Sequence, residues 1–236
     1  MRILRYIITC AAVSCASVAY ADSFTFSTPT GATVGGQPVN ATAVFVTGFP
    51  FVQVTIINNQ ANPTSIIQAI SDLSFDLSNV TSGFLVPPSN SNVERNIADN
   101  GTFTDGSLVA TGWALSNVGS TFHLNVLGTP IGPAHLIIGP PGNSDVYSNA
   151  NGSIAGNGPH NPFLAVEGRF AIFDLGITAD TQVSNVVFSF GTFNNIPDSG
   201  ATVALLGLGL MGLAAARAAA DPPSSTTHAH TQERKT

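Results

Sequence analysis

The residues Ser71-Asp72-Leu73-Ser74-Phe75-Asp76-Leu77 decide the fold class of this chain, because polar and apolar side chains alternate along them from Asp72 to Leu77. Successive side chains of a β-strand point to opposite faces of the sheet, so Leu73, Phe75 and Leu77 would share one face and the polar members the other. A strand with one buried and one solvated face is typical of an antiparallel sheet. We therefore predict that Asp72 and Asp76 are solvating residues on the wet face.

The same period of two recurs from residue 22 to residue 193, punctuated by Gly, Pro and Asn at short intervals, and no segment has a convincing helical period. It predicts further strands at 24–28, 39–47, 51–58, 107–115, 120–127, 135–138, 168–175 and 182–190, with 107–115 and 120–127 forming a hairpin. The polar segment 139–162 is predicted to be the main surface loop. Since such strands bury their apolar faces by pairing two sheets, we predict an all-β fold, an antiparallel β-sandwich of jelly-roll kind rather than a closed barrel.

Composition excludes several classes of function. Residues 22–196 hold ten acidic side chains against two basic ones, Arg95 and Arg169, so nucleic acid and anionic membranes are poor partners. The first lysine of the chain is Lys235, which removes Schiff-base chemistry from the rest of it. Solubility has to come from Asn, Ser, Thr and Gly, a pattern common in extracellular β proteins.

The N-terminus has the parts of a secretory signal peptide. Arg2 and Arg5 precede an apolar stretch that is followed by Ala19-Tyr20-Ala21, a small-x-small cleavage site, so we predict a signal peptide at 1–21 and a mature start at Asp22. A lipidated Cys15 is the alternative. Cys10 and Cys15 both lie in this segment, so the mature chain would contain no cysteine and no disulfide.

Near the C-terminus, Ile196-Pro197-Asp198-Ser199-Gly200 precedes an uncharged apolar run, Ala201 to Ala216, which Arg217 closes. Sixteen residues of helix span about 24 Å, somewhat less than the roughly 30 Å hydrocarbon core of a bilayer, so the run reads as a short transmembrane helix with Arg217 as stop-transfer charge. A glycine pattern at Gly207, Gly209 and Gly212 also fits a dinucleotide-binding turn. That alternative lacks the strands that would follow such a turn.

This segment resembles the PEP-CTERM type of sorting signal, and within it the VPDSG-CTERM variant, with Ile196 in place of the usual Val. The resemblance implies recognition by exosortase, a membrane-embedded cysteine transpeptidase that removes the helix. Its short motif corresponds to Pro197, Asp198, Ser199 and Gly200, its helix to Ala201–Ala216 and its basic cluster to Arg217. In contrast to the family pattern, this chain continues from residue 218 to Thr236.

No catalytic or metal motif stands out elsewhere. His123, His135 and His160 lack zinc-binding spacings and are predicted to be solvated surface residues. Loop oxygens around Asp99, Asp105 and Asn100-Gly101 could bind a structural calcium ion. Nucleophile motifs such as G-x-S-x-G are absent, and Trp113, although more typical of a core, could stack on a sugar.

The sequence thus predicts four parts: a signal peptide at 1–21, a β-sandwich cargo domain at 22–196, the motif with its transmembrane sorting helix at 197–217, and a polar tail at 218–236. The expected protein is a bacterial cell-surface or extracellular-matrix protein that an exosortase processes, without enzymatic activity, cofactor or metal, and transiently anchored in the inner membrane. The alternatives are a carbohydrate-binding module with an extracellular polysaccharide as partner and, more distantly, a secreted hydrolase.

Overall fold

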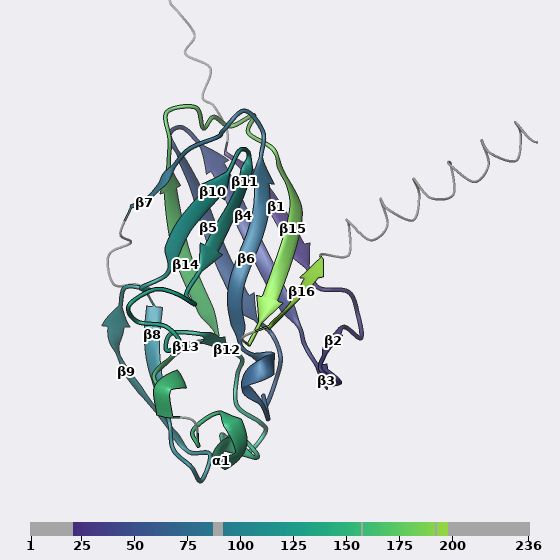
Figure 1. Cartoon of the computed structure of the whole chain (residues 1–236), viewed down its shortest axis with the longest axis vertical. Helices are drawn as coiled ribbons and strands as arrows, with labels where there is room; N and C mark the ends of the chain where they lie inside the picture. The colour runs from purple at the N-terminus through teal and green to yellow at the C-terminus, as the bar shows by residue number, and fades with distance from the viewer. Residues whose placement is uncertain (1–20, 87–91, 157, 192, 198–236) are drawn as a thin grey trace, which may run out of the picture.

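The computed structural model describes residues 21–86, 92–156, 158–191 and 193–197, and these form two sheets that pack face to face (Figure 1). The first sheet has the order β1-β4-β5-β14-β7 and is antiparallel throughout. Its strands are β1 (Asp22–Ser27), β4 (Ala41–Gly48), β5 (Phe51–Asn58), β14 (Glu167–Phe173) and β7 (Phe84–Val86). A small separate hairpin joins β2 (Thr33–Val34) to β3 (Gln37–Pro38).

The second sheet is built around β6 (Ile70–Leu77), which pairs with β11, β12 and β15. Its path is β10-β11-β6-β12-β13-β8-β9, with β15 and β16 attached beside β6. The bounds are β10 (Ala114–Val118), β11 (Thr121–Asn125), β12 (Ile137–Ile138), β13 (Phe163–Ala165), β8 (Asn92–Ile97), β9 (Phe103–Val109), β15 (Val183–Phe190) and β16 (Phe193–Pro197). The prediction of antiparallel pairing is therefore confirmed except between β12 and β13, which run parallel.

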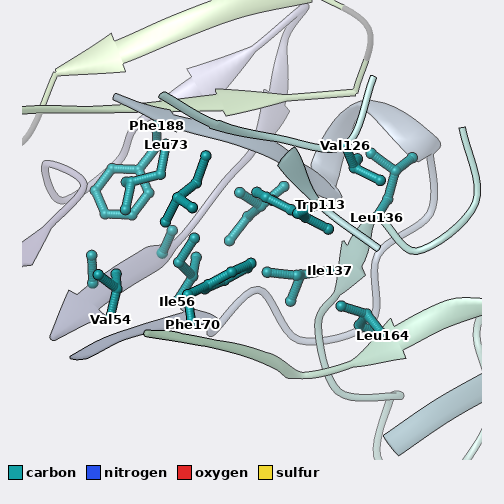
Figure 2. Close-up of a cluster of buried hydrophobic side chains, with 14 of the residues drawn as sticks. Val54, Ile56, Leu73, Trp113, Val126, Leu136, Ile137, Leu164, Phe170 and Phe188 are labelled. Atoms are coloured by element: carbon teal, nitrogen blue, oxygen red, sulfur yellow. The ribbon is translucent and has the colours of Figure 1, made fainter. Parts of the chain in front are cut away.

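The alternation of Ser71–Leu77 determines how the two sheets meet. Leu73, Phe75 and Leu77 are fully buried on the inner face of β6, as predicted. The ring of Phe75 lies 4.9 Å from that of Phe45 on the first sheet and 5.9 Å from that of Phe122 on the neighbouring strand β11. The core continues to Trp113, whose ring lies 5.3 Å from that of Phe170 (Figure 2).

One predicted strand was wrong, some strands were missed, and the predicted loop at 139–162 is confirmed in part, since it contains no strand but is not wholly at the surface. Residues 107–115 do not form one strand, because β9 ends at Val109 and β10 begins at Ala114, after Gly112, which has a φ of 70°. Strands β8 and β13 were not predicted at all, since 92–97 and 163–165 are too polar or too short to show a period. The segment 139–162 forms α1 (Ala150–Ser153) and the 3₁₀ turn Gly158–His160 at one end of the molecule, and it buries Tyr147, Ile154 and His160.

The predicted sorting helix, Ala201–Ala216, and the tail from 218 onward lie outside the described residues. Within the described part of the chain, no helix is long and apolar enough to cross a membrane. Helical structure there is limited to α1, the turn at Gly158–His160 and a second 3₁₀ turn, Ile66–Gln68, which Ser65 caps. The observed body is thus mostly β, and the jelly-roll assignment and the domain limits stay predictions.

The packing of Phe75 predicts a large loss of stability when its ring is removed. Because the side chain is fully buried against both sheets, Phe75→Ala should lower the free energy of unfolding by about 3–5 kcal/mol, the usual cost of such a truncation. Urea denaturation followed by fluorescence of the single tryptophan, Trp113, measures it. Val118→Ala, at a side chain 83% exposed, should change the free energy by less than about 0.5 kcal/mol, and equal losses in both variants would contradict this account.

Candidate functional site

The described chain ends where the predicted sorting motif begins. Strand β16 lies beside β15 in antiparallel register, with Ile196 opposite Phe188 and Pro197 opposite Val187. Proline lacks a backbone donor and is tolerated on an edge strand, which is the position of β16. The remaining motif residues, Asp198, Ser199 and Gly200, and the stop-transfer residue Arg217 lie outside the described residues. The β ladder therefore reaches into the motif without an intervening linker.

The predicted signal cleavage site lies at the other terminus. Ala21 is exposed and immediately precedes β1, which begins at Asp22, whereas Ala19 lies outside the described residues. Asp22 pairs with Thr47 of β4, so the sheet includes the first residue of the expected mature chain. Cleavage after Ala21 stays a prediction.

Asp72 departs from its predicted exposure. It is only 8% exposed, because it lies on β6 between Asn125 of β11 and Ser189 of β15, and His123 Nδ1 is 3.7 Å from its carboxylate. Burial raises the pKa of Asp72, and the nearby His123 opposes that rise only in part. The cluster joins a carboxyl group to an imidazole, yet it holds no nucleophile hydrogen-bonded to the imidazole in the described residues.

Asp76, on the same face of β6, is engaged by two side chains. Its carboxylate accepts hydrogen bonds from Thr121 Oγ1 at 2.6 Å and from Asn185 Nδ2 at 2.7 Å. The predicted solvating role thus fails for Asp72, and Asp76 is only partly exposed. Both aspartates bind their neighbours rather than open solvent.

Arg95 organises a second polar cluster at the opposite end of the larger sheet. It is 7% exposed, and its guanidinium donates two hydrogen bonds, 2.6 and 2.7 Å long, to the two carboxylate oxygens of Asp105. A third goes to Tyr147 Oη at 2.9 Å, and Tyr147 in turn donates to the carbonyl oxygen of Gly139. The ring of Phe103 lies 4.0 Å from the guanidinium carbon.

This cluster uses the groups that were predicted to bind calcium. Both oxygens of Asp105 are occupied by Arg95, and Asn100 Oδ1 accepts from the backbone and hydroxyl of Thr102. Across the described ranges, no three His, Cys, Asp or Glu side chains come together in a way that could hold a metal ion. The structure therefore does not assemble the Asp99–Asp105 site. One sequence signal pointed to the actual arrangement, since Arg95 is one of only two cations among ten acids.

Two of the three histidines predicted to be at the surface are buried. His135 is 3% exposed, and its ring nitrogens lie 2.9 Å from the carbonyl oxygen of Thr111 and 3.2 Å from Glu94. His160 is 5% exposed, and its Nδ1 has no hydrogen-bond partner. Only His123 keeps a substantially exposed ring.

Trp113 is also buried, at 5% exposed. Its Nε1 donates to the backbone carbonyl of His135 at 2.9 Å, and its ring packs on Phe170. The indole therefore presents no face on which a sugar ring could stack. The interpretation of Trp113 as a core residue is therefore confirmed and the alternative of a glycan-stacking Trp113 is wrong, because the interior supplies both an apolar contact and an acceptor for the indole.

The buried His160 predicts a loss of stability in acid. Burial lowers the pKa of His160, which the hydrogen bond to the Ser153 carbonyl only partly offsets, so protonation favours the unfolded chain. The contribution is complete above the unfolded-state pKa of about 6.5 and is lost as the pH falls below that value. His160→Gln should therefore flatten the fall of urea midpoint between about pH 7.5 and pH 5.

Val118→Gln, which places the same side chain at an exposed position without removing a titratable group, is the control and should keep the wild-type pH dependence. Burial raises the pKa of Asp72, so this residue increases the stability of the fold as the pH falls, opposite to His160. The contribution of Asp72 is present in both the wild type and His160→Gln. An unchanged pH profile for His160→Gln would contradict the assignment.

Comparison with known proteins identifies the C-terminal segment and nothing upstream of it. No curated protein and no solved structure matches the chain. A family model described as the VPDSG-CTERM motif matches residues 196–218, which begin on β16 and extend beyond the described residues. Residues 196–218 of this chain are a VPDSG-CTERM motif, a PEP-CTERM-like sorting signal for exosortase.

Proposed function

We propose that this protein is a non-catalytic component of the bacterial cell surface or extracellular matrix, delivered there through its C-terminal sorting signal. The observation that carries the proposal is the motif match at residues 196–218, which implies an exosortase in the membrane as the processing partner and the cell envelope or surface as destination. In this scheme the two-sheet domain, which we call the β body, is the exported domain, and the segment after it is the sorting signal.

Transient anchoring in the inner membrane is part of the proposal. The run from Ala201 to Ala216 contains no charged residue and ends at Arg217, and as a helix it would measure about 24 Å. A positive charge resists translocation, so the segment would stop with Arg217 inside and Pro197–Gly200 at the outer face, within reach of a membrane transpeptidase. The signal peptide at 1–21 would supply the export step.

The chemistry of the cargo supports a structural rather than an enzymatic role. Several buried polar side chains are committed to partners within the protein: Arg95 to Asp105, His135 to Thr111 and Glu94, and Trp113 to the backbone of His135. A general acid or base needs a position from which to reach a substrate, and these groups support the fold instead. Among the described residues, no contact favours carbohydrate binding through Trp113 or hydrolysis.

The motif itself can be tested by substitution. In a host with the cognate exosortase, Asp198→Ala or Pro197→Ala should leave an uncleaved, membrane-bound precursor, because recognition depends on the short motif. Deleting residues 201–236 should release the protein into the medium unprocessed, because the membrane segment is lost. Fractionation with immunoblotting and intact-mass measurement follow both outcomes.

Asp180→Ala is the matched control, since it makes the same change at an exposed aspartate in the loop before β15. This variant should be processed like the wild type. If Asp198→Ala and Pro197→Ala also give the wild-type mass and location, residues 197–200 are not a recognition signal, and the C-terminal segment would act as a simple anchor.

A further inference from the structure

Exposed apolar side chains gather at one end of the two sheets. Among the described residues, seven large hydrophobic side chains are exposed, and five of them lie at the end where β6 and β14 finish, the upper end in Figure 1. We call these five the apolar rim: Phe49 (66% exposed), Phe51 (36%), Phe84 (59%), Val118 (83%) and Leu175 (70%).

Two members of the rim, Phe51 and Phe84, are joined by an aromatic contact across neighbouring strands, and the other three lie in or beside nearby turns. Phe173, at the end of β14, is opposite both Phe51 of β5 and Phe84 of β7, and its ring lies 5.3 and 5.1 Å from theirs. Phe49 lies in the β4–β5 turn, where Asp174 donates its backbone N–H to the Pro50 carbonyl, and Leu175 follows Asp174. Val118 lies on the β10–β11 hairpin, which Asn117 ties to the carbonyl of Thr81 near β7.

This end also faces the direction in which the chain leaves toward its membrane segment. β15 begins at this end with Val183, and β16 runs back alongside it as far as Val187. Because β15 bulges between Ser184 and Val187, Val187 and Val183 are opposite Ser74 and Leu77 of β6, three strand residues apart, or about 10 Å. Four peptide steps separate Pro197 from Ala201, which allow at most about 14 Å of reach. The chain is therefore long enough for the apolar run to begin at the level of the rim.

A second copy of this chain is a poor occupant of the rim. The same end carries Asp22, Asp174 and Asp180 and neither arginine of the β body. Two copies would bring these like charges together.

A neutral lipid surface avoids this charge repulsion, because a zwitterionic headgroup layer does not repel carboxylates as an anionic one does. The anchor would hold the rim at high local concentration next to the bilayer, so weak apolar insertion would suffice.

We propose that the apolar rim docks onto the zwitterionic phospholipid surface of the membrane that holds the precursor, which fixes the β body upright on the bilayer beside the sorting motif. Phe49, Phe84, Val118 and Leu175 enter the headgroup region, and the aspartates stay at the aqueous edge. The inference rests on the proposed membrane anchoring, and it adds a second contact to that anchor.

The test uses the exported chain, residues 22–236, which contains all the described strands and no cysteine. A single Val118→Cys, labelled with an environment-sensitive fluorophore, reports on the rim, and Leu108→Cys, an exposed apolar position on β9 away from it, is the matched control. In phosphatidylcholine vesicles with nitroxide-bearing lipid, the label at 118 should be quenched at least about twofold more than the label at 108, since interfacial apolar groups lie about 5–10 Å into the headgroup boundary.

Adding Phe49→Ser and Phe84→Ser to Val118→Cys should abolish the excess quenching while the protein still floats with the vesicles. Both phenylalanines are more than half exposed, and unchanged Trp113 emission in the unlabelled double variant confirms the fold. Flotation with equal quenching at 118 and 108 would overturn the rim contact and leave the anchor intact. Failure to float would overturn the anchoring on which both proposals rest. A signal at 118 that grows with the protein-to-lipid ratio would instead indicate self-association and would also overturn the proposal.

Discussion

The whole described structure depends on apolar contact between two sheets that no disulfide bond joins. Both cysteines of the chain precede Asp22, so the sheets are held by packing such as that of Phe75, which contacts Phe45 across the interface and Phe122 beside it. Fully burying an aromatic side chain contributes about 1.5–3 kcal/mol, and a protein of this size is stabilised by a few such contacts beyond the cost of ordering the chain. This is why β6, which carries Phe75 and pairs with three strands, is the centre of the fold.

The strands that could be predicted are those in which polar and apolar side chains alternate with a period of two. Strand β5 was predicted with its observed limits, and β6 and β15 within one residue of theirs, because each alternates for about eight residues against a buried partner. The strands at 92–97 and 163–165 could not be found in this way. The pairing of β8 with β13 joins segments that are far apart in the chain, and β8 has its buried Arg95 among polar neighbours rather than an alternating apolar pattern.

The candidate functional residues also fall into those that could be predicted from the sequence and those that depend on tertiary contacts. A sorting signal is read by its enzyme as a linear segment, so residues 196–218 could be recognised from the sequence alone. The burial of His135, His160 and Trp113 could not, because it depends on Thr111, Glu94 and Phe170 coming from other elements. Asp72 illustrates the limit: its position in the alternation was correct, but its exposure depended on side chains of the two adjacent strands.

The register of β16 has a consequence for how the protein would be displayed. Because Pro197 is still paired with Val187, the sheet reaches into the motif, and no unpaired segment separates the sheet from the first residues of the motif. Many displayed domains are joined to their support by a flexible stalk, which lets each copy tumble. A domain joined through an edge strand would instead be held in a fixed orientation relative to the group to which its C-terminus is bonded. Neighbouring copies would then present the same surface outward, so that order in the support becomes order in the protein layer.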